Sequence, residues 1–497
     1  MGRNQTNPAA MIPIVTPTEM AAIDAAAPES VEELVDRAGS ALAVAARTML
    51  KGSYGRRVTV LAGQGNNGAD GRAAAYYLRR NGVRVAVVDA ADSPQTLPPC
   101  HLTIDAAYGT GLSRDHCPAP PPLSLNTRHD TPNQRAPILA ADIPSGVNGL
   151  TGELHGNPWH ATRTLAFGTL KPGLVLHPGA RYCGPISVAT LGLDTSQAKA
   201  HLLTASTAAN WLPGRPTAAH KWHAACWIIA GSQHMTGAAH LAALSSLRGG
   251  AGYVRLSTPG TNNFSGGPIE AVRHALPQKG WWQHMANQDL PRFKAILIGP
   301  GLGRQPHFNS EIRELLTHAP LPLVIDGDGL NALGSDVFKV LASRPAATIL
   351  TPHAGEYRAL TGSPPRPDSF DAARSLATST NATVLLKGPC TIVAQPDGTT
   401  IAIHNGDARL ATAGTGDVLA GLICGLLSAG APPQQATATA AWLHGQATQA
   451  LPHAPITASD LLPALAHAWE TTAAHRSSQR VPDTPKTVER PHQKSTP

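Results

Sequence analysis

The chain of 497 residues is poor in aromatic side chains, which make up 4% of it, and in charged side chains, which make up 14%. Few aromatic rings leave little surface on which nucleic-acid bases can stack. The formal net charge is +7, but residues 476–497 carry five basic and two acidic side chains, so this tail alone supplies +5 − 2 = +3. No run of Lys or Arg forms a basic patch elsewhere, and we expect no nucleic-acid partner.

Paired cysteines and long apolar runs are missing as well. The six cysteines include no C-x-x-C pair, which argues against zinc ribbons and redox dithiols and fits a reducing compartment. No apolar run approaches the roughly 20 residues of a membrane span, and the segment MGRNQTNPAAMIPIV lacks the apolar stretch of a secretion signal. These absences predict a soluble, cytoplasmic protein with no membrane partner.

The length exceeds what one core usually supports, so two or more domains are expected. Short apolar, β-branched runs alternate with helix-like segments, which is typical of a parallel sheet covered by helices on both faces. The strand candidates of the first half are 56–63, 83–90, 102–106, 136–144 and 161–168. The pattern breaks near 211–223 and restarts. We predict α/β domains at 1–215 and 216–475, followed by a polar, disordered tail at 476–497.

A glycine-rich loop follows the first strand candidate, in VTVLAGQGNNGADGRAAAYYL. Gly63, Gly65 and Gly68 match the fingerprint of a dinucleotide-binding turn, and Asp89 lies near the position of a ribose-binding acid. A nicotinamide dehydrogenase is therefore one alternative. Against it, Asp70 places a negative charge in the first turn of the helix, where it would repel a pyrophosphate.

Two further strand ends carry an aspartate and a flexible turn, IDAAYGTGLSRD (104–115) and AADIPSGVNGLTGE (140–153). Together with the asparagines of the first loop they offer hard oxygen ligands, which suit an alkali or alkaline-earth cation better than zinc. Taken singly, Asp142 and Ser145 also read as helix-cap or turn residues.

The stretch RLATAGTGDVLAGLICGLL (409–427) places glycines and threonines directly before an apolar, helix-like run from Val418 onward. It is not a Walker A loop, because no Lys–Ser/Thr pair follows its last glycine. Small residues at a helix N-terminus let backbone N–H groups approach an anion. Asp417 would repel a bound phosphate, so its position makes sense for a base that deprotonates the group attacking that phosphate.

The three motifs of the first half, GQGNNGADG, DAAYGTGLSRD and DIPSGVNGLTG, resemble the epimerase domain of NAD(P)H-hydrate repair enzymes, the YjeF N-terminal family, over about 16–205. The resemblance implies a Rossmann-like, three-layer α/β/α domain and a K⁺ ion held through Asn67, Asp105 and Ser145. It also implies that Asp142 is catalytic, either by moving a proton or by orienting the ring. The implied substrate contacts are Asn66, Asn67, Gly68, Ala69, Asp70, Gly109, Thr110, Gly111, Leu112, Ser113, Arg114, Asp115 and Asp142. Ala69 departs from the family's usual glycine, which a backbone with negative φ tolerates.

Six ordered motifs of the second half resemble the ADP-dependent (S)-NAD(P)H-hydrate dehydratase, a ribokinase-like α/β family, over 220–475. They are AGSQHMTGAAHLAA, IGPGLG, VIDGDGLNAL, TPHAGE, LLKGPCT and TAGTGDVLAG. The resemblance implies Mg²⁺ as a phosphate partner and ADP as co-substrate. It places Ala238, Gly301, His353 and Asp417 on the hydrated nicotinamide. The implied nucleotide contacts are Lys387, Gly388, Pro389, Cys390, Thr391, Gly414, Thr415 and Gly416.

The implied activity is repair of hydrated NADH and NADPH by epimerisation of the R and S forms and dehydration of the S form. In the second step Gly414 to Gly416 would hold the transferring phosphoryl group and Asp417 would be the base. Two alternatives remain: an ATP-dependent kinase of a vitamin alcohol, and a first half that only binds or scaffolds. The resemblance also implies a homo-oligomer, while the choice between ADP and ATP rests on no single residue.

Overall fold

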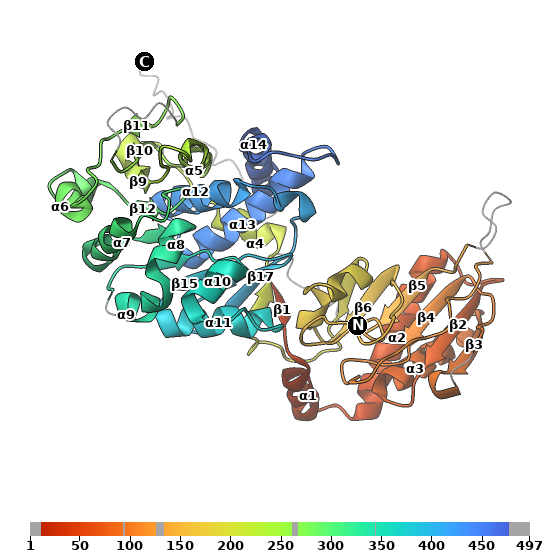
Figure 1. Cartoon of the computed structure of the whole chain (residues 1–497). Helices are drawn as coiled ribbons and strands as arrows, with labels where there is room; N and C mark the ends of the chain where they lie inside the picture. The colour runs from red at the N-terminus through yellow and green to blue at the C-terminus, as the bar shows by residue number, and fades with distance from the viewer. Residues whose placement is uncertain (1–10, 93–94, 126–133, 261–266, 343, 477–497) are drawn as a thin grey trace, which may run out of the picture.

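The computed structural model describes residues 11–92, 95–125, 134–260, 267–342 and 344–476, and these form two α/β units, each built around its own sheet (Figure 1). The predicted α/β architecture is thereby confirmed. The predicted tail lies outside the described residues except for Arg476, whose guanidinium donates to the carbonyl oxygens of Ala209 and Leu212.

The first sheet has six strands, all parallel, in the order β3-β2-β4-β5-β6-β7. The chain leaves β2 toward β3 on one side and then returns to β4 on the other, so the carboxyl ends of β2 and β4 form a switch point where ligands usually bind. The strands are β2 (Arg57–Ala62), β3 (Arg84–Asp89), β4 (Leu102–Ala106), β5 (Ile138–Ala141), β6 (Arg163–Phe167) and β7 (Ile186–Ala189).

Helices α2 (Val31–Leu50) and α3 (Asn66–Arg80) pack together on one face of this sheet. Ser30 caps α2, because its side chain accepts from the backbone N–H of Glu33 while Glu33 accepts from that of Ser30. The opposite face is covered, among the described residues, by irregular segments that contribute Leu97 and Trp159 to a small apolar cluster. The third layer of this unit is therefore built without a regular helix in the part described.

The second sheet has eleven strands in the order β1-β8-β17-β16-β15-β14-β13-β12-β9-β10-β11. It is parallel from β11 to β15, and β16 then runs antiparallel to both of its neighbours. The strands are β8 (Ala200–Leu202), β9 (Ala225–Ile229), β10 (Tyr253–Ser257), β11 (Val272–Arg273), β12 (Ala295–Ile298), β13 (Leu323–Ile325), β14 (Thr348–Leu350), β15 (Thr383–Leu386), β16 (Thr391–Ala394) and β17 (Thr400–Ile403).

Helices cover both faces of the second sheet, as predicted from the sequence. One apolar core includes residues of α4 (Ala205–Trp211), α5 (Thr236–Arg248), α12 (Thr415–Ser428), α13 (Pro433–Gln449) and α14 (Ala458–Ala474). The other includes residues of α6 (Trp281–Ala286), α7 (Pro306–His318), α8 (Asp328–Leu333), α9 (Val337–Ala342), α10 (Ala354–Thr361) and α11 (Ser369–Thr380). All residues of α12 from Val418 to Ser428 are buried, and this burial on every side explains why so glycine-rich a segment folds as a helix.

Strand β1 (Ile12–Ile14) and strand β8 belong to the second sheet although they lie within residues 1–215. Helix α1 (Pro17–Ala26) follows β1 directly, and the backbone N–H of Val15 donates to the carbonyl oxygen of Leu170 in the first unit (3.0 Å). Figure 1 shows β1 in red, reaching from the first unit to the second sheet. The boundary at residue 215 stays a prediction, with these segments shared between the units.

Among the described helices, none is long and apolar enough to cross a membrane.

Candidate active sites

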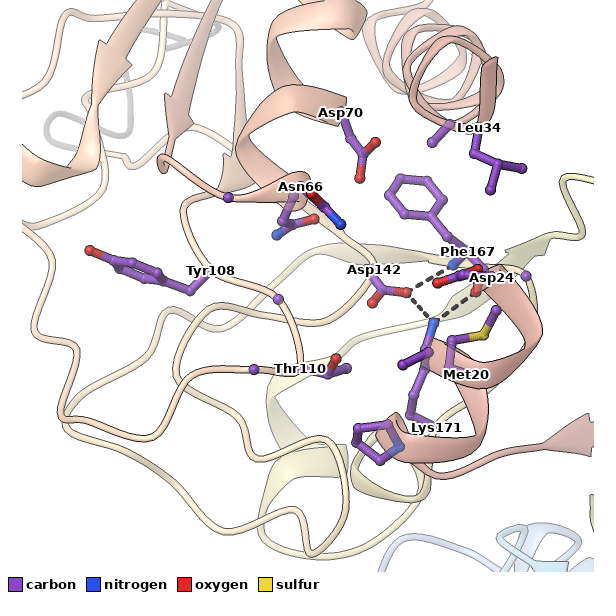
Figure 2. Close-up of a pocket in the computed structure, with 18 of the residues that line it drawn as sticks. Met20, Asp24, Leu34, Asn66, Asp70, Tyr108, Thr110, Asp142, Phe167 and Lys171 are labelled. Atoms are coloured by element: carbon purple, nitrogen blue, oxygen red, sulfur yellow. Dashed lines mark hydrogen bonds and ion pairs between the residues drawn. The ribbon is translucent and has the colours of Figure 1, made fainter. Parts of the chain in front are cut away.

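A cavity of about 900 Å³ lies at the carboxyl ends of the first sheet, where β2, β4, β5 and β6 end (Figure 2). Its walls come from the N-terminus of α3, the loop after β4, and helices α1 and α2. Of the residues that the sequence places on the substrate, the cavity is lined by Asn66, Asn67, Asp70, Gly109, Thr110, Gly111, Leu112, Ser113, Arg114 and Asp142. Gly68, Ala69 and Asp115 are not among the lining residues.

Asp142 follows β5 and has a left-handed backbone, with φ of 63°. Such a conformation costs free energy in a non-glycine residue and occurs most often at functional sites. One carboxylate oxygen accepts from the backbone N–H of Phe167 (3.0 Å) and from the ammonium group of Lys171. Lys171 is 1% exposed and also donates to the carbonyl oxygen of Phe167 (2.7 Å). The ion pair and the backbone hydrogen bond fix the direction of the Asp142 side chain.

Lys171 is a site residue that sequence reasoning missed. Its segment FGTLKPG follows a predicted strand, and a lysine at a strand end was a signal within reach. The contributions of α1 and α2 to the cavity, which include Met20, Asp24 and Leu34, were missed because nothing in their sequence points to a ligand.

Asp70 comes from α3 and lies 8% exposed on the cavity wall. Burial raises the pKa of Asp70 to about 8; the nearby carboxylates of Asp142 and Asp24 add to the shift, and the Lys171 ammonium opposes it. Its neighbour Ala69 lies inside the same helix without a positive φ, so the methyl group in place of the family's glycine causes no strain.

The glycines of the first loop serve close packing. A Cβ atom on Gly68 would lie 1.8 Å from the carbonyl oxygen of Gly63, so only glycine lets α3 begin directly beside the end of β2. Asp89 is occupied by protein groups: it accepts from Gln64 Nε2 (3.1 Å) and lies 3.6 Å from the Arg72 guanidinium. Close packing explains Gly68, and contacts with Gln64 and Arg72 explain Asp89, so the dinucleotide-like pattern does not require a bound ribose.

The residues predicted to hold K⁺ lie deep under the same loops. Asp105 accepts from both the hydroxyl (2.6 Å) and the backbone N–H (2.9 Å) of Ser145, and burial raises the pKa of Asp105. Asn67 is buried, and neither its amide oxygen nor its amide nitrogen has a hydrogen-bond partner. A buried amide oxygen without a partner is costly unless it coordinates something, so Asn67 fits an oxygen-seeking cation. Within the described residues no group of three or more His, Cys, Asp or Glu side chains forms a further metal site.

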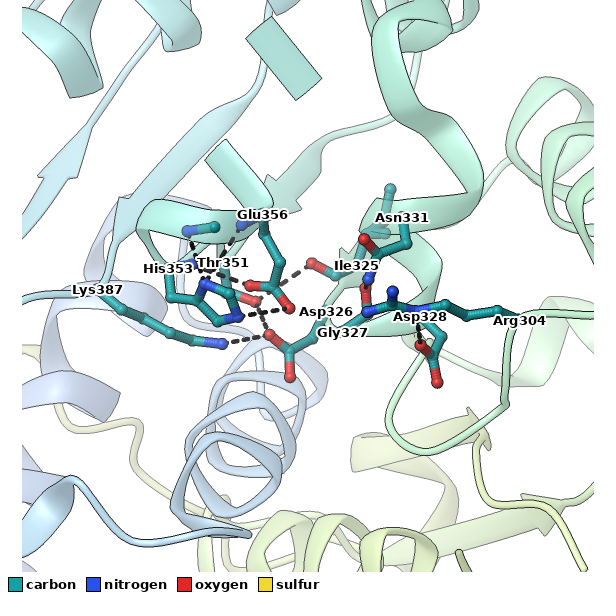
Figure 3. A network of polar contacts seen from close by, with 11 residues as sticks. Arg304, Ile325, Asp326, Gly327, Asp328, Asn331, Thr351, His353, Glu356 and Lys387 are labelled. Atoms are coloured by element: carbon teal, nitrogen blue, oxygen red, sulfur yellow. Dashed lines mark hydrogen bonds and ion pairs between the residues drawn. The ribbon is translucent and has the colours of Figure 1, made fainter. Parts of the chain in front are cut away.

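A second polar site lies at the carboxyl ends of β13, β14 and β15 in the second unit (Figure 3). Asp326 accepts from Lys387 Nζ (2.5 Å) and from the hydroxyl of Thr351 (2.6 Å). Burial alone would lower the pKa of Lys387, but the Asp326 and Glu356 carboxylates outweigh it and raise that pKa. Burial also raises the pKa of Glu356. Asp326 lies in the motif VIDGDGLNAL and Glu356 in the motif TPHAGE, but the sequence alone predicted no role for either residue.

Asp417 lies in the first turn of α12 and faces this network. Burial raises the pKa of Asp417 to about 7, and Asp326 contributes to the rise while Lys387 opposes it. Gly416 adjoins the same lysine, because a Cβ atom built on it would be 3.5 Å from Lys387 Nζ. The structure therefore brings together Lys387, Gly416 and Asp417, which come from two motifs far apart in the sequence.

The backbone donors of this turn differ from the prediction in detail. Helix α12 begins at Thr415, not at Val418, and the N–H of Thr415 donates to the carbonyl oxygen of Thr412 (3.3 Å). The N–H groups of Gly414, Gly416 and Asp417 have no acceptor within the described part of the chain. Gly414 has φ of 90°, which directs the chain into the helix and which side chains rarely allow. The unpaired donors at this helix end suit an anion.

The other residues predicted for this site differ in their contacts and in their exposure. Gly301 touches Ala238, since a Cβ atom on Gly301 would lie 2.7 Å from that of Ala238. His353 caps α10 by accepting from the backbone N–H groups of Gly355 and Glu356, yet its side chain is 58% exposed. In the turn between β15 and β16, Gly388 and Pro389 are exposed, Thr391 is half-buried and Cys390 is buried, which leaves the Cys390 thiol facing the core.

Comparisons with known proteins agree for both units. Residues 226–469 match the family described as NAD(P)H-hydrate dehydratase, and residues 31–98 and 88–173 match the family described as YjeF-related protein N-terminus. The bifunctional NAD(P)H-hydrate repair enzyme of Moorella thermoacetica is 33% identical, over 79% of this chain and 82% of the relative. That of Gloeobacter violaceus is 33% identical, over 84% and 88%. A crystal structure of the ADP/ATP-dependent NAD(P)H-hydrate dehydratase from Bacillus subtilis has a TM-score of 0.47 and 29% identity, and covers 55% of this chain and 98% of that one.

Two polar sites at the carboxyl ends of two separate sheets define an enzyme with two active centres. The chain belongs to the family of bifunctional NAD(P)H-hydrate repair enzymes, with an epimerase domain before a dehydratase domain.

Proposed function

We propose that the second site dehydrates the S form of hydrated NADH or NADPH at the expense of ADP. The observation that carries this proposal is the position of Asp417 beside unpaired backbone donors and Lys387. Phosphoryl transfer needs positioning and charge stabilisation more than covalent help, and this turn supplies both.

In the proposed reaction Asp417 takes the proton of the 6-hydroxyl group as its oxygen attacks the β-phosphorus of ADP. The bond from that phosphorus to AMP breaks, and AMP leaves. Phosphate is a far better leaving group than hydroxide, so it then departs from the ring carbon C6 with its electron pair. The neighbouring carbon C5 loses a proton to water, and that electron pair forms the C5–C6 double bond. The products are the restored dihydronicotinamide, AMP and phosphate.

The backbone N–H groups of Gly414, Gly416 and Asp417 would hold the transferring phosphoryl group, and Lys387 would add a compact positive charge beside it. Mg²⁺ is expected to arrive on the nucleotide phosphates. Gly388, Pro389 and Thr391 would contact the nucleotide, with Cys390 through its backbone only.

We propose that the first cavity interconverts the R and S forms. Hydration of the ring at one carbon gives two epimers, and a dehydratase specific for one would leave the other unrepaired. Asp142, held by Lys171, would face the hydrated ring together with Asn66 and Thr110. The cavity, at about 900 Å³, has the size typical of small-molecule sites.

K⁺ is proposed for the epimerase cavity, with Asn67, Asp105 and Ser145 as the residues that would hold it. The unpartnered amide oxygen of Asn67 supports this assignment. The ion would supply a fixed positive charge near the loops that carry the substrate.

The kinase alternative accounts for Asp417 but leaves the first cavity without a role, and the family match of both units favours repair. Incubation of the chain with S-hydrate and either ADP or ATP separates the two. Recovery of dihydronicotinamide absorbance supports the dehydratase, whereas a phosphorylated product without recovery supports a kinase.

A homo-oligomer in the cytoplasm is the expected form of the protein. The six cysteines are all free, which supports a reducing compartment. Sedimentation velocity of the full chain tests the assembly.

A further inference from the structure

The carboxyl group of Asp70 stands out because it lines the cavity without a protein partner. It is 8% exposed, and within the described part of the chain it makes no hydrogen bond and no ion pair. Figure 2 shows it projecting from α3 toward the space above Asp142. A buried carboxyl that stabilises a fold is normally hydrogen-bonded, so this one is more costly than useful to the structure alone.

The second carboxyl of the cavity is in the opposite situation. Asp142 is fixed by Lys171 Nζ and by the backbone N–H of Phe167, which both donate to one of its carboxylate oxygens. Asp70 faces three charged or titratable groups, namely Asp142, Asp24 on α1 and Lys171, and burial raises its pKa to about 8. One carboxyl of the cavity is thus tied to a cation and the other has no protein partner, and two carboxyl groups in such unlike surroundings are the pattern of an acid and a base.

We propose that Asp70 is a catalytic residue of the epimerase cavity, the proton donor to the hydroxyl group that leaves the hydrated ring. The proposal rests on the epimerase function proposed above for the same cavity. It goes further than a substrate contact, because it gives the Asp70 carboxyl a proton to transfer at a defined atom.

The bond from the ring carbon C6 to its hydroxyl oxygen breaks, the electron pair stays on oxygen, and Asp70 supplies the proton that makes water. The ring nitrogen N1 gives its lone pair to form a double bond to C6. A water molecule then adds to the other face of C6, the N1 lone pair is restored, and the carboxylate of Asp142 takes the released proton. Proton exchange with water then removes the proton from Asp142 and returns one to Asp70. The reverse reaction exchanges the roles of the two carboxyl groups.

The test compares Asp70→Asn with the native full-length chain. Asn keeps the shape of the side chain but has no acidic proton. We expect the kcat of epimerisation to fall about 100-fold or more, within the usual range for a lost general acid, while the KM for the R hydrate changes less than threefold. We also expect the native kcat to decline above about pH 8, where Asp70 loses its proton, and the residual activity of Asp70→Asn to lack that decline.

Two controls separate chemistry from folding. Asp36→Asn makes the same change at an exposed carboxylate of α2 that only accepts from the Tyr77 hydroxyl, and it should keep native kinetics. Dehydration of the S hydrate by the same preparation reports whether Asp70→Asn is folded. In heavy-oxygen water, the native enzyme should place one labelled oxygen on the ring for each inversion.

Each outcome decides the matter. A fall in the kcat of Asp70→Asn smaller than about 100-fold, or a loss confined to KM, overturns the proposal. So does inversion by the native enzyme with retention of the original oxygen. If Asp70→Asn fails to fold, the native pH profile decides, and a kcat that stays level above pH 8 overturns it. A native chain that does not epimerise at all refutes the epimerase function itself, which is a distinguishable result.

Discussion

Lys387 Nζ lies 2.5 Å from the carboxylate of Asp326 and adjoins Gly416, so one ammonium group joins the end of a central strand to the first turn of α12. Lys387 directly follows β15, and Asp326 directly follows β13. These two strands lie on either side of β14 in the sheet. Their contact places the positive charge of the site beside Asp417 and beside the unpaired backbone donors.

Replacement of Asp417 by Asn is expected to lower the kcat of dehydration about 100- to 10,000-fold, because the attacking hydroxyl loses its base. Epimerisation should be unchanged, since the first cavity lies on another sheet. The measurement is recovery of dihydronicotinamide absorbance from the S hydrate with ADP. Asp289→Asn, at a carboxylate that is 58% exposed, is the matched control. Parallel loss of both activities in a folded Asp417→Asn chain would contradict the account.

The pH dependence of dehydration should follow the ionisation of Asp417. A base must be deprotonated, and burial raises the pKa of Asp417 to about 7, so kcat/KM should increase as pH rises through about 7 and then level off. An unshifted aspartate would already be fully active at pH 5. Rates measured from pH 5 to pH 8.5 decide between the two, and a flat profile over that range argues against Asp417 as the base.

Lys387→Met removes the positive charge that opposes the rise in the pKa of Asp417. The midpoint of the pH profile should therefore move upward, and the KM for ADP should increase because a phosphate partner is lost. Unchanged values of both would show that Lys387 serves only to pair with Asp326. The KM for the R hydrate in epimerisation serves as the internal control.

Potassium should activate the epimerase in a saturable way. At constant ionic strength, replacement of K⁺ by choline is expected to slow the conversion of R to S hydrate, while dehydration of the S hydrate serves as the reference. Asn67→Ala removes the buried amide that has no protein partner, so it should abolish the response to K⁺. Equal rates in K⁺ and choline for the native chain would exclude this role for Asn67, Asp105 and Ser145.

Besides supplying a proton, Asp70 should lower the free energy of unfolding of the chain as the pH rises. Its pKa is raised to about 8, so the unfolded chain releases this proton near pH 4 while the folded chain keeps it. The free energy of unfolding therefore decreases between about pH 4 and pH 8, by at most about 1.4 kcal/mol per pH unit from this group. Asp70→Asn should unfold at a higher temperature than the native chain at pH 8, with a smaller difference at pH 5. Calorimetry tests this, and a variant less stable at pH 8 would contradict it.

The sequence was most informative where a motif combines chemistry with a place in the fold. The loops GQGNNGADG and TAGTGDVLAG follow or precede clear apolar runs, so both sites could be placed at strand ends in advance. Asp142 and Asp70 line the first cavity, and Lys387 lies near Asp417 in the second unit; their roles stay predictions. Strands β2 to β6 of the first sheet were predicted because each is a short apolar run between breakers, whereas β7 was not predicted.

Other features depend on contacts between distant segments, which no local pattern encodes. Lys171 reads as an ordinary lysine until β6 brings it to Asp142, and its burial comes from the packing of that loop. The pairing of β1 with β8 joins residues near the N-terminus to the second sheet. The N–H of Thr415 donates within its own turn, where Gly414 has φ of 90°. Composition alone does not set that backbone angle.

The most direct test of the account is a stoichiometric one. Purified full-length protein is mixed with S-hydrate of NADH and ADP, and dihydronicotinamide, AMP and phosphate are measured together. The account predicts that all three form in a ratio of one to one to one and that Asp417→Asn forms none of them. Restoration of dihydronicotinamide without AMP, or a stable phosphorylated hydrate in its place, would contradict the assignment of Asp417 and its glycine turn as a phosphoryl-transfer centre.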